Sequence, residues 1–203
     1  MITQDQLAID IIKSVMLKKN YAFFENGKYN LNLIGIRTNN KIPNNFDDWI
    51  VAIYKDDSDK WVIKKWEATT DAGTYWLLNP MNTKGTALLV PNQYRKGWRI
   101  GLHKGQYKAL VQNKPVQVYR DSDKDLILDY ENTTIDTGIF GINIHRSNPS
   151  RPSTKVEKWS AGCQVFADPK DFDEFTDLCD TSARLWGSEF TYTLLTENDF
   201  NGL

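Results

Sequence analysis

Short apolar runs separated by polar turns are the feature that most limits how this chain can fold. From Trp49 onward, stretches rich in Val, Ile, Leu, Trp and Tyr alternate with segments rich in Asp, Asn, Gly and Lys. This pattern is typical of a protein built from an antiparallel sheet, and we therefore predict a mainly β fold with a few helices. The expected strands are 31–36, 49–54, 61–66, 86–90, 98–103, 109–111, 116–119 and 190–195.

Two segments have the pattern of helices instead. Thr3 and Gln6 form a capping box before an apolar series at helical spacing, which predicts a helix from Thr3 to about Lys19. The pair Asp168-Pro169 supplies a cap and a first-turn proline for a second helix, expected to end at about Cys179. Cys179 falls on the apolar stripe of that helix and is expected to be a buried thiol.

Composition limits the organisation and the partners of the chain. With 203 residues, 40% of them hydrophobic, it is long enough for one well-buried core and short for two full domains. We expect an N-terminal helix and extension over 1–45, packed on a single domain over 46–203. The formal charge of −1 gives no field that favours nucleic acid. There is no transmembrane run and no secretory signal at the N-terminus.

One cysteine and one histidine stand where catalysis is plausible on chemical grounds. His145 closes the apolar run 141–145, and Cys163 lies in the run 159–166. A free cysteine has a pKa of about 8.5, so it becomes a good nucleophile only beside a group that takes its proton. The two residues are too far apart for one helix face or a tight hairpin, which predicts two adjacent strands joined by a loop.

The residues before Cys163 are small. The stretch Ser160-Ala161-Gly162 lets main-chain N–H groups approach a reacting carbonyl, so the N–H groups of Gly162 and Cys163 are the expected oxyanion hole. We expect Cys163 on a short turn between a loop and a helix, where N–H dipoles favour the thiolate.

These two blocks resemble the L,D-transpeptidase catalytic domain of the YkuD type. That family has an upstream histidine, a variable loop and a Ser-His-Gly-Cys signature, and the matching positions here are His145, 146–158 and 160–163. The strand order over 49–76 and a closing strand at 190–195 also follow the family, so the resemblance covers roughly 47–195. It implies an antiparallel β-sandwich with an N-terminal helix and a helix after the cysteine.

The resemblance also implies an activity. Cys163 would be the nucleophile and His145 the base, oriented by the main-chain carbonyl of Arg146, with Gly162 at the oxyanion. The chain would then be a cysteine acyl-transfer enzyme, a transpeptidase or a peptidase, acting on stem peptides of bacterial peptidoglycan without a cofactor. A phage lysin or another delivered protein would be made in the cytoplasm and reach the wall without a signal peptide. The alternative is a non-catalytic wall-binding or phage structural module of the same fold.

Several residues are expected at the substrate. Ala161 replaces the second histidine of the family signature, and His103 is the residue that could take its place. The expected substrate-binding residues are Ser160, Trp159, His103 and Arg151. Arg146, Arg151 and Lys155 suit the carboxylates of a stem peptide. Aromatic residues at 75, 76, 94 and 98 are expected either to line a cleft or to pack in the core.

Metal binding has weak support. The carboxylates of Asp121, Asp123, Asp125 and Asp129 have the spacing of a calcium loop. However, Leu126 occupies the position where such loops need glycine, and Asn132 replaces the bidentate glutamate, so a solvated acidic turn is the favoured interpretation. The two histidines fit no zinc motif.

Overall fold

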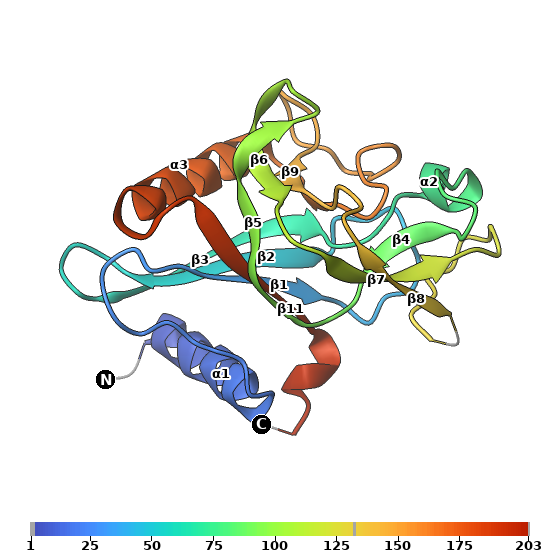
Figure 1. Ribbon diagram of the computed structural model, residues 1–203. Helices are drawn as coiled ribbons and strands as arrows, with labels where there is room; N and C mark the ends of the chain where they lie inside the picture. Colours follow the sequence, from blue (N-terminus) through green and yellow to red (C-terminus); the bar gives the residue numbers. More distant parts are fainter. Residues whose placement is uncertain (1–2, 132, 203) are drawn as a thin grey trace.

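The computed structural model describes residues 3–131 and 133–202 (Figure 1). It confirms a mainly β fold, in which the larger sheet closes into a barrel. The barrel strands, in spatial order, are β1 (Asn32–Arg37), β11 (Glu189–Thr196), β5 (Gln93–His103), β6 (Tyr107–Gln112), β9 (Ile144–Arg146), β10 (Gln164–Phe166), β3 (Trp61–Thr69) and β2 (Asp48–Lys55).

The barrel differs from the expected sandwich because its first and last strands pair. β1 is parallel to β11, with Leu33 beside Tyr192, and antiparallel to β2, with Leu33 beside Ala52. This pairing joins the two edges of the sheet, and a closed barrel has no free strand edge. The stretch 32–37, expected as part of an N-terminal extension, is therefore one of the barrel strands.

Helix α1 (Gln4–Lys18) covers part of the outer surface of the barrel (Figure 1). The Thr3 hydroxyl accepts the N–H of Gln6 at 3.1 Å, but the Gln6 side chain donates to Asp10 at 2.9 Å, so only half of the predicted capping box forms. The buried face of the helix packs on side chains from β1, β2 and β11, and this cluster contains Ile9, Ile12, Val15, Met16, Ile34, Val51, Ile53 and Leu195. The packing fixes α1 to the barrel.

Helix α3 (Pro169–Trp186) follows β10 and is longer than expected. The Asp168 carboxylate accepts the N–H of Lys170 at 2.8 Å, so the predicted cap is confirmed. Phe172 and Phe175 pack with Trp66 and Phe166 of the barrel core. Cys179 is buried in the same core, as expected.

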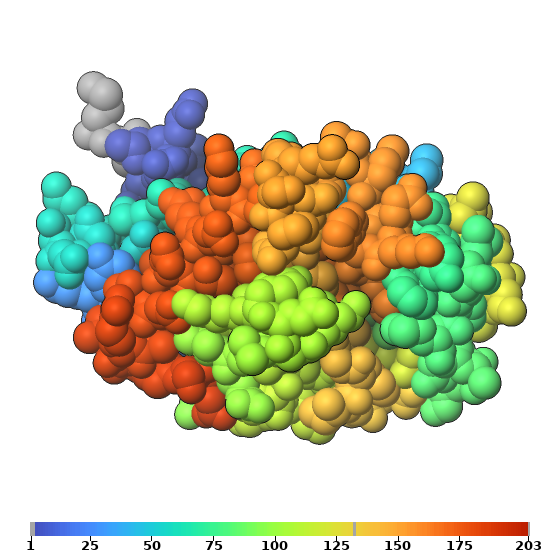
Figure 2. Space-filling model, turned by 90° about the horizontal axis from the view of Figure 1, so that it is seen from above, coloured from blue at the N-terminus to red at the C-terminus, as the bar shows by residue number. Residues whose placement is uncertain are grey.

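A three-stranded sheet lies beside the barrel. It consists of β4 (Thr86–Leu89), β7 (Val116–Asp121) and β8 (Thr134–Gly138), and the short helix α2 (Thr74–Leu78) precedes it. Leu77 and Leu88 join these elements in a small separate core. Figure 2 shows the α2 segment, the β5–β6 turn and the long loop before β10 meeting on one hollowed face of the molecule.

The chain ends with a short 3₁₀ helix, η1 (Glu197–Phe200). Within 3–131 and 133–202, none of the helices is long and apolar enough to cross a membrane.

Candidate active site

Strands β9 and β10 bring the predicted nucleophile and base together. They pair in parallel, with Val165 beside His145, and this adjacency confirms the prediction of neighbouring strands. Side chains alternate along a strand, so Cys163, two positions before Val165, projects from the same face as His145. Both residues line one cavity of about 310 Å³. A parallel pair needs a long crossover, which the loop between the strands supplies.

The turn before Cys163 is held by Ser160 and depends on Gly162. The fully buried Ser160 hydroxyl donates to the Cys163 carbonyl at 2.8 Å and accepts the Gly162 N–H at 3.1 Å. Gly162 has a φ of +115°, and a Cβ there would lie 2.2 Å from the Ala87 oxygen. Ser160 therefore shapes the turn, in contrast to its expected contact with substrate.

The same turn corrects two expectations about the catalytic machinery. The Gly162 N–H is occupied by Ser160, so it is not a free oxyanion donor. The Cys163 N–H, by contrast, makes no hydrogen bond within the part of the chain that the structure describes. Cys163 also leads into β10, and the following helix begins only at Pro169. The N-terminus of α3 therefore does not follow directly on the cysteine, in contrast to the expectation.

Main-chain groups of the loop between β8 and β9 hold the sulfur. The Asn143 N–H donates to Cys163 Sγ at 3.4 Å, and the thiol donates to the Gly141 carbonyl at 3.5 Å. Gln112 fixes this segment, because its Oε1 accepts the N–H groups of Phe140, Gly141 and Ile142 at 3.0, 2.9 and 3.0 Å. Sequence reasoning missed Gln112, since a glutamine at a strand end gives no local signal of such a role.

Hydrogen bonding fixes the proton of His145. Its Nδ1 lies 2.7 Å from the Arg146 carbonyl, which can only accept, so Nδ1 carries the proton. Tyr107 Oη lies 3.3 Å from both Nδ1 and that carbonyl. The buried Nε2 thus has a lone pair, and it has no hydrogen-bond partner among the described residues. This lone pair is available to accept a proton.

The same reasoning assigns the proton of His103. Asn143 Oδ1 accepts the main-chain N–H of Gln112 at 3.0 Å, so its Nδ2 faces His103 Nδ1, 3.1 Å away. Because an amide nitrogen only donates, His103 Nδ1 is the acceptor and Nε2 carries the proton. The rings of His103 and His145 stack with centroids 4.0 Å apart. The two adjacent imidazoles thus provide one acceptor, His145 Nε2, and one donor, the Nε2–H of His103.

Burial keeps the cysteine and the histidine neutral in this state. It raises the pKa of Cys163 to about 11, against the opposing effect of the Asn143 N–H. Burial, and then His103, lower the pKa of His145 to about 3. The expectation of a favoured thiolate is therefore wrong for this state, in which the sulfur is hydrogen-bonded to the main chain and not to Nε2.

Cationic and aromatic side chains form the walls around the pair. Lys104, Lys158 and Trp159 line the Cys163 cavity and also an adjoining recess of about 330 Å³. Trp159, one of the expected substrate-binding residues, is 39% exposed. In the recess, the Arg146 guanidinium lies 4.1 Å from the centre of the Tyr107 ring. Sequence reasoning missed both lysines, which follow no pattern.

Most of the remaining predicted residues lie away from the Cys163 cavity. Arg151 is exposed and lines neither cavity, and Lys155 bonds Asn45 at 3.0 Å. Tyr94 and Trp98 are buried in the barrel core, so they line no cleft, whereas Trp76 lines the Cys163 cavity.

The acidic segment gathers three of its four carboxylates. Oxygens of Asp121, Asp123 and Asp129 lie within 4.8 Å of one another, and Asp125 is outside this group. Asp121 is buried, which raises its pKa to about 6, and its Oδ2 accepts the Asp129 N–H at 3.2 Å. Asn132 lies outside the described residues. Because acidic clusters are common without an ion, the group alone does not establish a cation site.

Comparisons with protein-family models, with curated proteins and with solved structures found no match.

Proposed function

We propose that this protein is a cysteine acyl-transfer enzyme that acts on peptide stems of bacterial peptidoglycan, as the resemblance to L,D-transpeptidases implies. The observation that carries the proposal concerns His145, which lines the same cavity as Cys163 and whose Nε2 has no hydrogen-bond partner in 3–131 and 133–202. A buried imidazole nitrogen without a hydrogen bond lowers the stability of the fold, so its presence calls for a functional explanation. A base for the thiol is the role that fits its surroundings.

The reaction begins with a proton transfer. The Cys163 proton leaves the Gly141 carbonyl and moves to His145 Nε2 as the sulfur forms a bond to the carbonyl carbon of an amide. The carbonyl electron pair becomes an oxyanion. When it collapses, the C–N bond breaks, and the leaving amine takes the proton from Nε2. A second amine or water then attacks the thioester carbonyl and gives its proton to Nε2. The C–S bond breaks, and the sulfur regains that proton as the thiol, which gives exchange or hydrolysis.

Two donors suit the oxyanion. The Cys163 N–H carries no hydrogen bond among the described residues, and the Nε2–H of His103 belongs to a residue that lines the same cavity. A donor of this kind is worth about 3 to 4 kcal/mol in a protease oxyanion hole. His103 would thus supply the imidazole that Ala161 removes from the family signature.

The charges of the walls suit the substrate class. A stem peptide carries free carboxylates, and positive charge is close at hand: Lys104 and Lys158 line the Cys163 cavity, and Arg146 lines the adjoining recess. Trp159 offers an apolar surface to a peptide side chain. A protein delivered to the wall, such as a phage lysin, is the setting that we propose for this activity.

Purified peptidoglycan fragments provide the test. We expect the unmodified protein to change the masses of disaccharide tetrapeptides, with loss of a terminal residue for hydrolysis and a new residue for exchange. Cys163→Ala and His145→Ala should abolish both changes, while Cys179→Ala, which removes the other thiol, should react normally. Full turnover by either of the first two variants would refute the proposal.

The alternative function is a wall-binding module that has lost its chemistry. The raised pKa of Cys163 and the missing Sγ–Nε2 hydrogen bond favour it. Sedimentation with insoluble peptidoglycan distinguishes the two functions. Tight retention without any change in fragment masses would support the binding module.

A further inference from the structure

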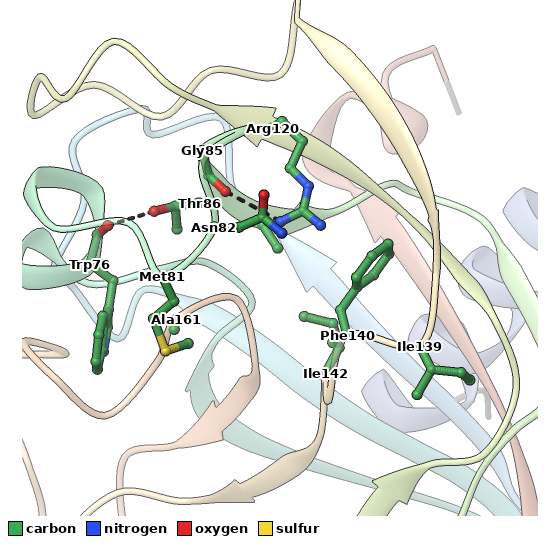
Figure 3. Close-up of a pocket in the computed structure, with 11 residues that line it drawn as sticks. Trp76, Met81, Asn82, Gly85, Thr86, Arg120, Ile139, Phe140, Ile142 and Ala161 are labelled. Atoms are coloured by element: carbon green, nitrogen blue, oxygen red, sulfur yellow. Dashed lines mark hydrogen bonds between the residues drawn. The ribbon is translucent and has the colours of Figure 1, made fainter.

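A second cavity adjoins the candidate active site. It has a volume of about 280 Å³ and shares Trp76, Met81 and Ala161 with the cavity of Cys163 (Figure 3). Ala161 is two positions before Cys163 in the same turn. A ligand that spans both cavities would therefore pass directly beside the sulfur.

Arg120 provides the charged part of this cavity. The side chain is 4% exposed, and its guanidinium lies 4.6 Å from the centre of the Phe140 ring (Figure 3). Nη1 donates to the Gly85 carbonyl and Nη2 to the Asp136 carboxylate, each at 3.2 Å. Since a guanidinium has five N–H donors, each Nη keeps one further hydrogen without an acceptor among the described residues.

The positive charge is incompletely balanced. Asp136 is the carboxylate that pairs with Arg120 in the described part of the chain, and it also pairs with Lys84 at 3.3 Å. The buried guanidinium thus shares its carboxylate with a lysine whose side chain is 60% exposed. Because a buried charge is costly without a full partner, this arrangement favours the binding of one further negative charge.

Much of the remaining lining of the cavity is apolar and unusually exposed. Met81 is 74% exposed and Ile139 is 59% exposed, although both are large hydrophobic side chains lining the cavity. Phe140 and Ile142 also line the cavity, and they belong to the loop whose Gly141 and Asn143 hold the sulfur. Apolar walls with a few fixed polar groups are typical of ligand-binding pockets.

We propose that this cavity is a subsite for a peptide that presents one carboxylate to Arg120 and an apolar side chain to Met81 and Ile139. The inference rests on the proposed function, because it places the peptide's reacting carbonyl at Cys163. A carboxylate suits the single unbalanced charge, and the guanidinium can bind it through two parallel hydrogen bonds. Inorganic phosphate shares this chemistry and is the competing ligand to exclude.

Binding can be measured separately from catalysis. The protein is Cys163→Ala, which cannot form a thioester, and the probes are N-acetyl-D-alanine, its uncharged amide, and inorganic phosphate, each titrated by NMR. We expect the acid to bind about tenfold or more tightly than the amide. Arg120→Gln should remove this preference, and circular dichroism shows whether the buried substitution has kept the fold.

Asn82→Asp provides a variant that does not disturb the buried arginine. Asn82 is exposed, and its Oδ1 accepts the Lys84 N–H at 2.9 Å, which an aspartate can also do. The added negative charge in the cavity wall should weaken acid binding severalfold and leave the amide unchanged. Asn26→Asp adds the same charge at an exposed position outside this cavity and should change neither.

The outcomes separate this proposal from the proposed function. Equal binding of acid and amide, acid binding that survives both Arg120→Gln and Asn82→Asp, or tighter binding of phosphate would each overturn the subsite. If the acid binds as expected while the unmodified protein leaves peptidoglycan fragments unchanged, the subsite stands and the enzyme assignment fails.

Discussion

Gln112 is the residue on which the position of the sulfur most depends. Its side-chain oxygen accepts three consecutive main-chain N–H groups, from residues 140, 141 and 142. The same segment provides the two main-chain partners of Cys163 Sγ, at Gly141 and Asn143. Gln112→Ala should therefore weaken both the fold and the chemistry.

The expected loss of stability follows from the number of hydrogen bonds. The alanine variant loses the three bonds that Oε1 accepts and the two that Nε2 donates to the Lys114 and Gly138 carbonyls, so at about 1 kcal/mol each the loss in the free energy of unfolding is about 5 kcal/mol. For a chain of this length, each kcal/mol lowers the Tm by roughly 2–4 °C, so the expected fall is roughly 10–20 °C. Gln112→Glu keeps the accepting oxygen and loses only the donor bonds to Lys114 and Gly138, so it should lose less.

Differential scanning calorimetry and fragment turnover test this together. Gln4→Ala is the control, because Gln4 is exposed on α1 and outside both cavities. We expect Gln112→Ala to lose at least tenfold in kcat with little change in KM, since the sulfur moves while the cavity walls stay. A Tm within about 2 °C of the unmodified protein together with full turnover would refute the role of Gln112.

Three further predictions concern individual residues of the described chain. Gly162→Ala should lower the free energy of unfolding by about 2 kcal/mol or more, because the φ of residue 162 is +115° and the new Cβ would meet the Ala87 oxygen. Chemical denaturation measures this loss, and unchanged stability would contradict the turn geometry. Asp121→Asn should raise the Tm at pH 7.5 and change it little at pH 4.5. The pKa of Asp121 in the folded protein is about 6, above that of the unfolded chain, so its stabilising protonated form is lost as the pH rises through 6; an equal change in Tm at both pH values would disprove this sign. His103→Ala should lower kcat with little loss of stability. Recovery of activity in His103→Asn, which keeps a side-chain donor, would support a donor role for His103. Unchanged kcat in His103→Ala would exclude that role.

Local patterns predicted the individual elements well. The apolar runs became strands, and the caps at Thr3 and Asp168 began helices, because these signals depend on neighbouring residues in the chain. Closure of the barrel was not predictable in this way. It depends on the pairing of β1 with β11, at opposite ends of the sequence, and no local pattern encodes that contact.

The same distinction holds for the candidate site. His145 and Cys163 were identifiable because rare reactive residues close apolar runs, and the structure places both on one cavity. The protonation states were not predictable, since the pKa of Cys163 depends on how deeply the barrel and loop bury it. The roles of Gln112 and Ser160 depend on hydrogen bonds that appear only after folding.

Trapping of a covalent intermediate tests the central claim most directly. Intact-mass spectrometry after incubation with a carbapenem should show one adduct on the unmodified protein, and peptide mapping should place it on Cys163. Cys163→Ala should remain unmodified, and His145→Ala should react far more slowly because no base takes the thiol proton. A protein that forms no adduct, carries it on Cys179, or reacts equally fast without His145 would contradict the proposed pairing of thiol and imidazole.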